Sequence, residues 1–131
     1  MSGKITLPAV LISAVLLASC AVVLIGAGVG AGAYTYVKGE LTRSYAADYN
    51  RTLKVCTEII KDLGQPIVEK TTDGAQTTIQ TTRKDGTPQT IKVVILSPDR
   101  TQVAVRTGVV GYWKKDISMQ FQEFVFQRLQ K

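Results

Sequence analysis

Two cysteines are the residues of this chain best suited to covalent chemistry, and the sequence contains no histidine. A cysteine reacts or binds metal as the thiolate, which many enzymes form beside an imidazole. Catalysis through a histidine base is therefore excluded. Glu58 and Asp62 have the four-residue spacing of a solvated helical pair, and no acidic or thiol side chains cluster at metal-ligand spacing. We expect no catalytic residue, no metal ion and no cofactor, and hence no enzyme.

Cys20 follows a segment with the three parts of an export signal. Lys4 gives a basic start, Ile5–Leu17 is an apolar run of 13 residues, and two small residues precede the cysteine. The Leu-Ala-Ser-Cys sequence that ends at Cys20 resembles the bacterial lipobox, where the signal is cut and the thiol receives a diacylglycerol. We expect residues 1–19 to be a signal peptide and Cys20 to carry fatty acyl chains such as palmitate. The alternative is a buried cysteine inside an uncleaved membrane helix.

A lipidated Cys20 would place the protein in the bacterial cell envelope. Two acyl chains give a lasting membrane anchor, whereas one chain gives only marginal binding. Ala21 follows the cysteine where an Asp favours retention in the inner membrane of enterobacteria. We therefore expect a membrane-anchored protein that faces the periplasm, with the outer membrane favoured over the inner.

A second apolar stretch continues from residue 21 to residue 37. Glycines in this stretch form two overlapping GxxxG spacings, and these candidate helix-packing residues are Gly26, Gly28, Gly30 and Gly32. Three interpretations remain open: a flexible tether behind the lipid, a helix that dips into the bilayer, and an uncleaved transmembrane anchor that begins near residue 5. We assign residues 20–38 to the lipidated cysteine and this tether or membrane segment, and residues 39–131 to a soluble domain.

The soluble domain begins with a predicted helix over Leu41–Leu63. Apolar residues recur there at three- and four-residue steps, and Gly64 and Pro66 end the pattern. Cys56 lies on the apolar stripe, which predicts a buried, unreactive thiol rather than a nucleophile.

Four strands and a second helix follow. Turn signals at regular spacing predict strands at Ile67–Thr72, Ala75–Thr82, Thr90–Leu96 and Thr101–Thr107, the last with alternating side chains. Asp73-Gly74 is the strongest hairpin signal among the turns. Asp116 is expected to cap a helix that runs to about Gln130. The predicted fold class is α+β, a four-stranded antiparallel meander packed by two helices in the order α-β-β-β-β-α.

Several segments resemble a known family. Residues 28–32, and the Tyr-Thr-Tyr-Val-Lys-Gly-Glu-Leu stretch at residues 34–41, are similar to domain of unknown function 3568. So are Asp85–Thr87 before an apolar strand and Arg106–Gly108 ahead of the last helix. Members are small bacterial envelope lipoproteins without an assigned activity, so the resemblance implies location and fold. Members often have acidic residues where this chain has Tyr112–Lys115, which implies a different partner here.

The leading hypothesis is a lipid-anchored, periplasm-facing envelope protein with a structural or adaptor role. Its partners would be the membrane, through the lipid, and an envelope protein or a second copy; no small-molecule substrate is identified. The alternative is a single-pass protein whose uncleaved helix self-associates through GxxxG faces. Removal of residues 1–19 leaves a net charge of +5, which suits anionic headgroups. Nucleic-acid binding is not expected, because the cations are dispersed and export removes the target.

The best candidates for a partner contact are an aromatic pair and two lysines in the predicted connection before the last helix. They are Tyr112, Trp113, Lys114 and Lys115. Aromatic residues beside cations suit a protein or headgroup contact. The alternative is that Trp113 packs as a lid on the core.

Overall fold

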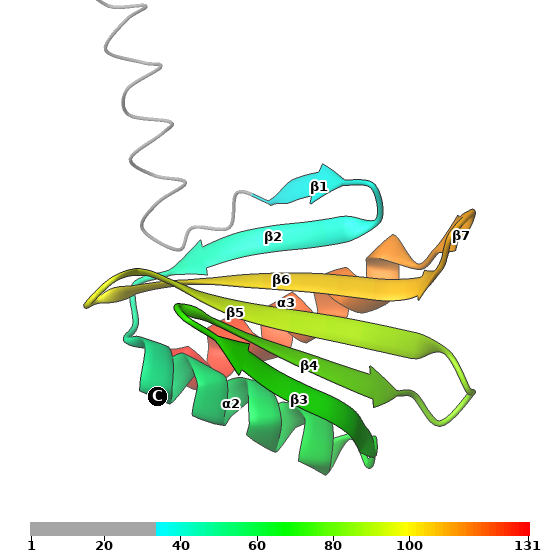
Figure 1. The fold of residues 1–131 in the computed structure, drawn as a ribbon, viewed down its shortest axis with the longest axis horizontal. Helices are drawn as coiled ribbons and strands as arrows, with labels where there is room; N and C mark the ends of the chain where they lie inside the picture. Colours follow the sequence, from blue (N-terminus) through cyan, green and yellow to red (C-terminus); the bar gives the residue numbers. More distant parts are fainter. Residues whose placement is uncertain (1–33) are drawn as a thin grey trace, which may run out of the picture.

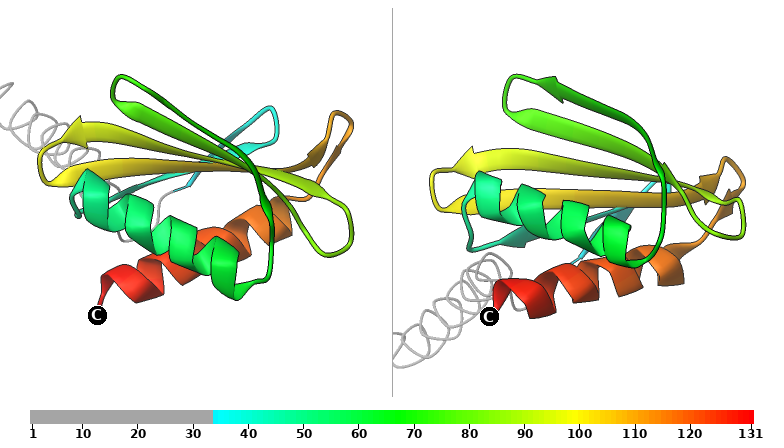
Figure 2. Two further views of the ribbon diagram at one scale, coloured as in Figure 1. Left: turned by 60° about the horizontal axis from the view of Figure 1, so that its bottom comes forward. Right: turned by 90° about the horizontal axis from the view of Figure 1, so that it is seen from below.

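The structure is a computed structural model that describes residues 34–131. A seven-stranded antiparallel sheet forms one layer, and two helices cover one of its faces (Figures 1 and 2). The predicted α+β class is confirmed, but the sheet has more strands than the four predicted. The predicted signal, Cys20 and the glycines at positions 26, 28, 30 and 32 lie outside the described residues. Neither described helix is long and apolar enough to cross a membrane.

Four consecutive strands form the predicted meander. They are β3 (Ile67–Asp73), β4 (Gln76–Thr82), β5 (Pro88–Ser97) and β6 (Arg100–Val109). In β4, β5 and β6 alternate side chains face the helices, and Ile79, Ile91 and Val105 are fully buried there. The β3–β4 turn begins at Gly74, whose φ is 60°, and therefore lies one residue later than the predicted Asp73-Gly74 turn.

Two further strands occupy the region before and inside the start of the predicted helix Leu41–Leu63. β1 (Thr35–Val37) and β2 (Glu40–Tyr45) form a hairpin, and β2 pairs with β6, so the strand order is β1-β2-β6-β5-β4-β3. The predicted helix start at Leu41 is wrong. Leu41 and Tyr45 are four residues apart, which satisfies both the helical repeat and the two-residue alternation of a strand. β1 precedes residue 39, where the sequence placed the domain boundary.

α2 (Tyr49–Asp62) is the remainder of the predicted first helix. The Asp48 carboxylate caps it by accepting a hydrogen bond from the Arg51 backbone N–H at 3.2 Å. Cys56 is fully buried on the side that faces the sheet, as predicted, and burial raises the pKa of its thiol to about 12. Leu63 is the C-cap of the helix, and Gly64 (φ 69°) turns the chain toward β3.

α3 (Lys115–Leu129) confirms the second predicted helix. Lys114 rather than Asp116 occupies the N-cap position and makes no capping side-chain hydrogen bond, while Asp116 lies in the first turn. The predicted cap is therefore wrong by two residues. Phe121 and Val125 are buried against the sheet and α2, as the apolar pattern predicts.

Candidate functional site

Three turns lie together at one end of the sheet. The start of β2 and the start of β5 both pair with the end of β6, through Glu40 opposite Arg106 and Gln89 opposite Thr107. The end of β6 also pairs with a short strand, β7 (Tyr112–Trp113). The β1–β2, β4–β5 and β6–β7 turns therefore share this end, which we call the turn end (right in Figure 1).

The four predicted contact residues all lie at the turn end, but they do not form one patch. Tyr112 is 78% exposed, whereas Trp113 is half-buried. The Lys114 ammonium bonds the Thr87 hydroxyl at 3.0 Å, in the β4–β5 turn. The Lys115 ammonium lies 5.0 Å from the centre of the Tyr36 ring on β1. Adjacent residues in the sequence thus connect β7 and α3 to two different turns.

Trp113 packs between turns and is not part of the central core cluster. Its ring lies so close to Gly39 that a Cβ at that position would overlap it. Gly39 and Lys38 also have positive φ angles of 82° and 50°, as a tight two-residue hairpin turn requires. On its other side the Arg106 guanidinium lies 5.3 Å from the ring centre. Trp113 therefore fixes the β6–β7 hairpin against the β1–β2 turn.

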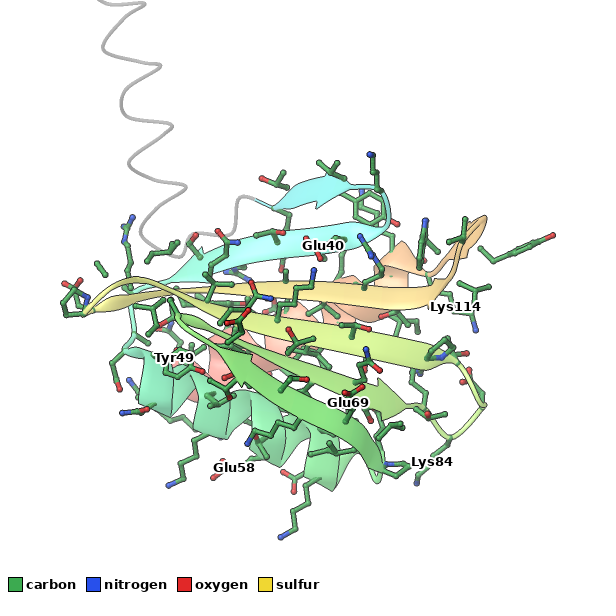
Figure 3. All side chains as sticks on the ribbon, in the orientation of Figure 1. Glu40, Tyr49, Glu58, Glu69, Lys84 and Lys114 are labelled. Atoms are coloured by element: carbon green, nitrogen blue, oxygen red, sulfur yellow. The ribbon has the colours of Figure 1, made fainter. Side chains whose placement is uncertain are left out.

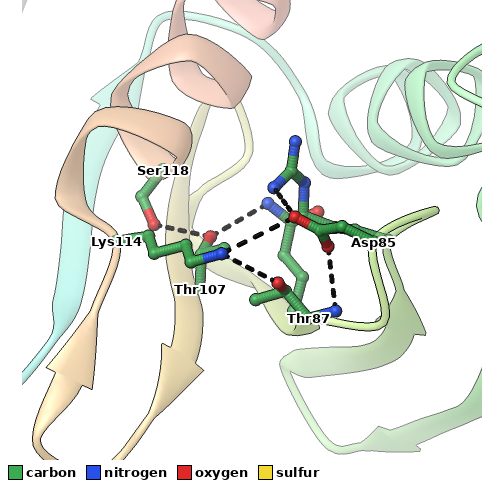
Figure 4. Close-up of polar contacts among 7 residues, drawn as sticks. Asp85, Thr87, Thr107, Lys114 and Ser118 are labelled. Carbon is green, nitrogen blue, oxygen red and sulfur yellow. Dashed lines mark hydrogen bonds and ion pairs between the residues drawn. The ribbon is translucent and has the colours of Figure 1, made fainter.

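Asp85 organises the β4–β5 turn (Figure 4). One carboxylate oxygen accepts the Thr87 backbone N–H at 2.9 Å, and the other lies 3.2 Å from Arg83 and 3.6 Å from the Lys114 ammonium. Hydrogen bonds from the Thr87 side chain and backbone, with the Lys114 and Arg83 cations, lower the pKa of Asp85 to about 2. Asp85 is therefore ionised at neutral pH and links the turn to the start of α3.

Exposed aliphatic side chains at the turn end were missed by the sequence analysis. Val110 is 85% exposed, and the other exposed apolar residues of this end are Val37, Val109 and Tyr112. We call these four residues the apolar tip. Two valines directly before Gly111, at a hairpin where polar residues usually stand, are the signal that could have revealed it. Lys38 and Lys115 flank the tip and form no ion pair within residues 34–131.

A cavity of about 250 Å³ opens at the same end, on the helix-covered side of the sheet. It lies between the end of α2, the β4–β5 turn and the first turns of α3. Phe121 and Phe124 form part of its wall, Gln65 and Gln89 reach it from the buried side, and Lys84 lies at its mouth. Lys84 and Lys114 mark this end of the molecule in Figure 3.

The paired carboxylates on α2 have separate surroundings. Asp62 bonds Arg128 of α3 at 2.8 Å, and Glu58 is exposed (Figure 3). Over the described part of the chain, His, Cys, Asp and Glu residues form no group of three that could hold a metal ion. The turn end combines the exposed apolar tip with a small pocket.

Comparison with curated proteins gives no significant match. The family described as "Protein of unknown function (DUF3568)" matches residues 4–125, a range that includes all the strands, α2 and most of α3. The chain therefore belongs to the DUF3568 family.

Proposed function

We propose that the protein is a lipid-anchored, periplasm-facing envelope protein with a structural or adaptor role, and that it rests its turn end on the membrane that holds its anchor. The lipobox-like sequence at Cys20 supports the anchor, with the outer membrane favoured over the inner. Cys56 is buried and has a raised pKa, so it does not offer the exposed thiolate that a cysteine nucleophile needs. The proposed role is binding rather than catalysis.

The apolar tip is the observation that carries this proposal. Val110 is 85% exposed and Tyr112 is 78% exposed, at the far point of a hairpin held in place by Trp113. Transfer of exposed aliphatic side chains out of water is favourable, by about 25 cal/mol per Å² of apolar surface. A hairpin tip is also narrow enough to enter the boundary between lipid headgroups and acyl chains.

Two exposed lysines lie at the same end of the molecule as the tip. Lys38 follows Val37 on the β1–β2 turn, and Lys115 begins α3 two residues after Trp113. Each such cation contributes about 1 kcal/mol of attraction near an anionic surface. Tyr112 and Trp113 are the side chains that membrane proteins place at the headgroup level. A lipid surface is therefore the occupant whose chemistry matches both the apolar tip and its rim.

The position of the anchor permits this orientation. Thirteen residues separate Cys20 from Tyr34, and 13 extended residues reach about 45 Å. β1 then runs from Thr35 to Val37 and ends at the tip itself. An acylated Cys20 and the apolar tip can thus enter the same leaflet.

Trp113 offers a direct test because it is the only tryptophan of the chain. The full-length protein, reconstituted in phosphatidylethanolamine and phosphatidylglycerol vesicles with brominated acyl chains, should show quenched Trp113 fluorescence. Val110→Asp should remove most of the quenching, because it places a charge in the aliphatic tip. Leu96→Asp is the matched control, since Leu96 is 48% exposed at the opposite end of β5 and should leave the quenching unchanged. Equal quenching in the Val110→Asp protein would overturn tip docking.

The anchor has a separate test. Mass spectrometry of the native N-terminus should find a chain that begins at an acylated Cys20, and Cys20→Ala should accumulate uncut and without lipid. An uncut chain with a free Cys20 thiol contradicts lipidation and favours the uncleaved membrane helix.

A further inference from the structure

The cavity at the turn end has the construction of a small ligand site, and it lies apart from the apolar tip. A partly open cavity of about 250 Å³ lies between the end of α2, the β4–β5 turn and α3. Phe121, which is 2% exposed, and the half-buried Phe124 belong to its lining. An apolar cavity of ~150 Å³ holds a benzene molecule, so this one has room for a phenyl ring and several further atoms.

Two buried amides beside the cavity have unused hydrogen-bonding capacity. Gln89 is 2% exposed and Gln65 is 8% exposed, and both line the cavity. The Oε1 atom of each is shielded from water and has no hydrogen-bond partner within the described residues. A buried acceptor without a partner costs about 1–3 kcal/mol, which a donor from a bound molecule would recover. The terminal torsion of glutamine is broad, so a small rotation turns either amide toward the cavity.

The Nε2 atom of Gln89 already has a partner, so a rotation of this amide must keep that hydrogen bond. Its Nε2 donates to the Thr107 hydroxyl at 3.0 Å, and that hydroxyl lies 2.8 Å from the Ser118 hydroxyl of α3 (Figure 4). These hydrogen bonds hold the Gln89 side chain between β5, β6 and α3, and its Oε1 is the atom that remains without a partner. A bound N–H or O–H donor would give this buried oxygen the partner that it lacks.

The mouth of the cavity supplies a cation. Lys84 is exposed and forms no ion pair within residues 34–131, whereas its neighbour Arg83 is engaged by Asp85. The Lys84 side chain passes over Gly64, where a Cβ would come within 2.9 Å of its Cε atom. The bare glycine therefore lets the end of the Lys84 side chain lie across the end of α2, and Lys84 also forms part of the cavity lining.

We propose that this cavity binds an N-acylated apolar amino acid with a free carboxylate. The apolar side chain would lie against Phe121 and Phe124, the amide N–H would donate to the Gln65 and Gln89 oxygens, and the carboxylate would meet Lys84. This chemistry occurs in two sources, a small acyl amino acid and the carboxy-terminal residue of a polypeptide.

Calorimetric titration of the full-length protein in lipid nanodiscs tests the ligand chemistry. N-acetyl-L-phenylalanine should bind saturably. N-acetyl-L-phenylalaninamide lacks the carboxylate and 3-phenylpropionate lacks the amide N–H, and each should bind about tenfold more weakly, as expected for one lost charge-assisted or buried hydrogen bond. N-acetylglycine lacks the apolar side chain and should not bind measurably. Equal affinity for all four probes, or no saturable binding of the first, overturns the proposal.

Two variants assign the contacts to residues. Lys84→Met keeps the chain that crosses Gly64 and removes the charge, so it should weaken N-acetyl-L-phenylalanine about tenfold and leave the amide probe unchanged. Gln65→Leu should weaken the same ligand and leave 3-phenylpropionate unchanged. Lys61→Met is the control, because Lys61 is an exposed lysine of α2 outside the cavity lining. A uniform loss for every probe, or no loss in either variant, contradicts the assignment.

A longer peptide separates the two sources. Ala-Ala-Ala-Phe with a free carboxylate should compete as well as N-acetyl-L-phenylalanine if the cavity takes the end of a polypeptide. Binding of the small ligand alone identifies an acyl amino acid as the occupant, and binding of neither contradicts the site. The ligand titrations do not depend on Trp113 quenching. Absence of ligand binding would therefore contradict the cavity proposal without contradicting membrane docking.

Discussion

Gln122 and Gln89 are both buried amide side chains on the helix-covered side of the sheet, and they differ in how completely their polar atoms are used. The Oε1 atom of Gln122 accepts from the Tyr45 hydroxyl at 2.6 Å, and its Nε2 donates to the carbonyl oxygens of Leu41 at 3.1 Å and Val103 at 2.8 Å. The Oε1 atom of Gln89 has no partner within the described residues. The first amide joins α3 to β2 and β6, and the second faces a cavity.

The difference reflects how the helices lie on the sheet. Where α3 crosses β2 and β6, the elements are close enough for one side chain to bridge all three. At the turn end, α2 has ended, the chain passes through Gly64 to β3, and α3 is only beginning, so the space between them is incompletely filled. A fully bonded buried amide contributes to stability, whereas one with a free oxygen at a cavity is available to a ligand.

Among the substitutions that test this comparison, one at Gln122 should change stability the most. Gln122→Leu removes three hydrogen bonds from a fully buried position and should lower the free energy of unfolding by about 2 kcal/mol. Urea denaturation of the full-length protein in detergent measures it. Gln127→Leu is the matched control, because Gln127 is exposed on the same helix and should change stability by less than about 0.5 kcal/mol. Equal effects of the two substitutions would show that the buried amide adds no net stability.

Patterns among neighbouring residues were sufficient to predict strands β3 to β6 but not β1 and β2. Apolar residues alternate in β5 and β6, and the turns between β3 and β6 contain glycine or proline; both signals depend only on neighbours in sequence. β2 could not be distinguished from a helix, since Leu41, Tyr45 and Tyr49 fit both repeats. The buried Arg43 between them, 4% exposed beneath Tyr34, Tyr45 and Phe126, is a tertiary arrangement that sequence patterns do not show.

The candidate site was partly predictable for the same reason. The aromatic and basic composition of Tyr112–Lys115 drew attention to residues that lie at the turn end, but their role as a partner contact stays a prediction. The partners of Trp113 and Lys114 come from distant turns. The cavity had no sequence signal. Gln65 and Gln89 stand in no motif, and only the packing of α2, the β4–β5 turn and α3 brings them together.

The second prediction is that the same type of substitution at Gln65 does not lower the free energy of unfolding. Gln65→Leu replaces a buried oxygen that lacks a partner with an apolar group of similar size, so the free energy of unfolding should stay the same or rise by up to about 1 kcal/mol. The same urea denaturation measures it. A loss of stability as large as that of Gln122→Leu would show that the Gln65 oxygen is hydrogen-bonded in solution. It would contradict the distinction between fully bonded and partly bonded buried amides.

The smallest effect concerns pH and is confined to the turn end. The pKa of Asp85 is lowered from 3.8 to about 2, so the stabilisation that its carboxylate gives the turn is complete above pH 4 and is lost as the pH falls toward 2. The Thr87 amide, which donates to that carboxylate, should show an NMR chemical-shift change with a midpoint near pH 2. Asp85→Asn should abolish this change, because an amide side chain does not titrate.

The Gln122 side-chain amide, whose partners are a tyrosine hydroxyl and carbonyl oxygens, should not follow that transition while the fold persists. A midpoint near pH 4 at Thr87 would mean that Lys114 and the turn do not hold the carboxylate in solution, and that the start of α3 is not tied to the cavity mouth.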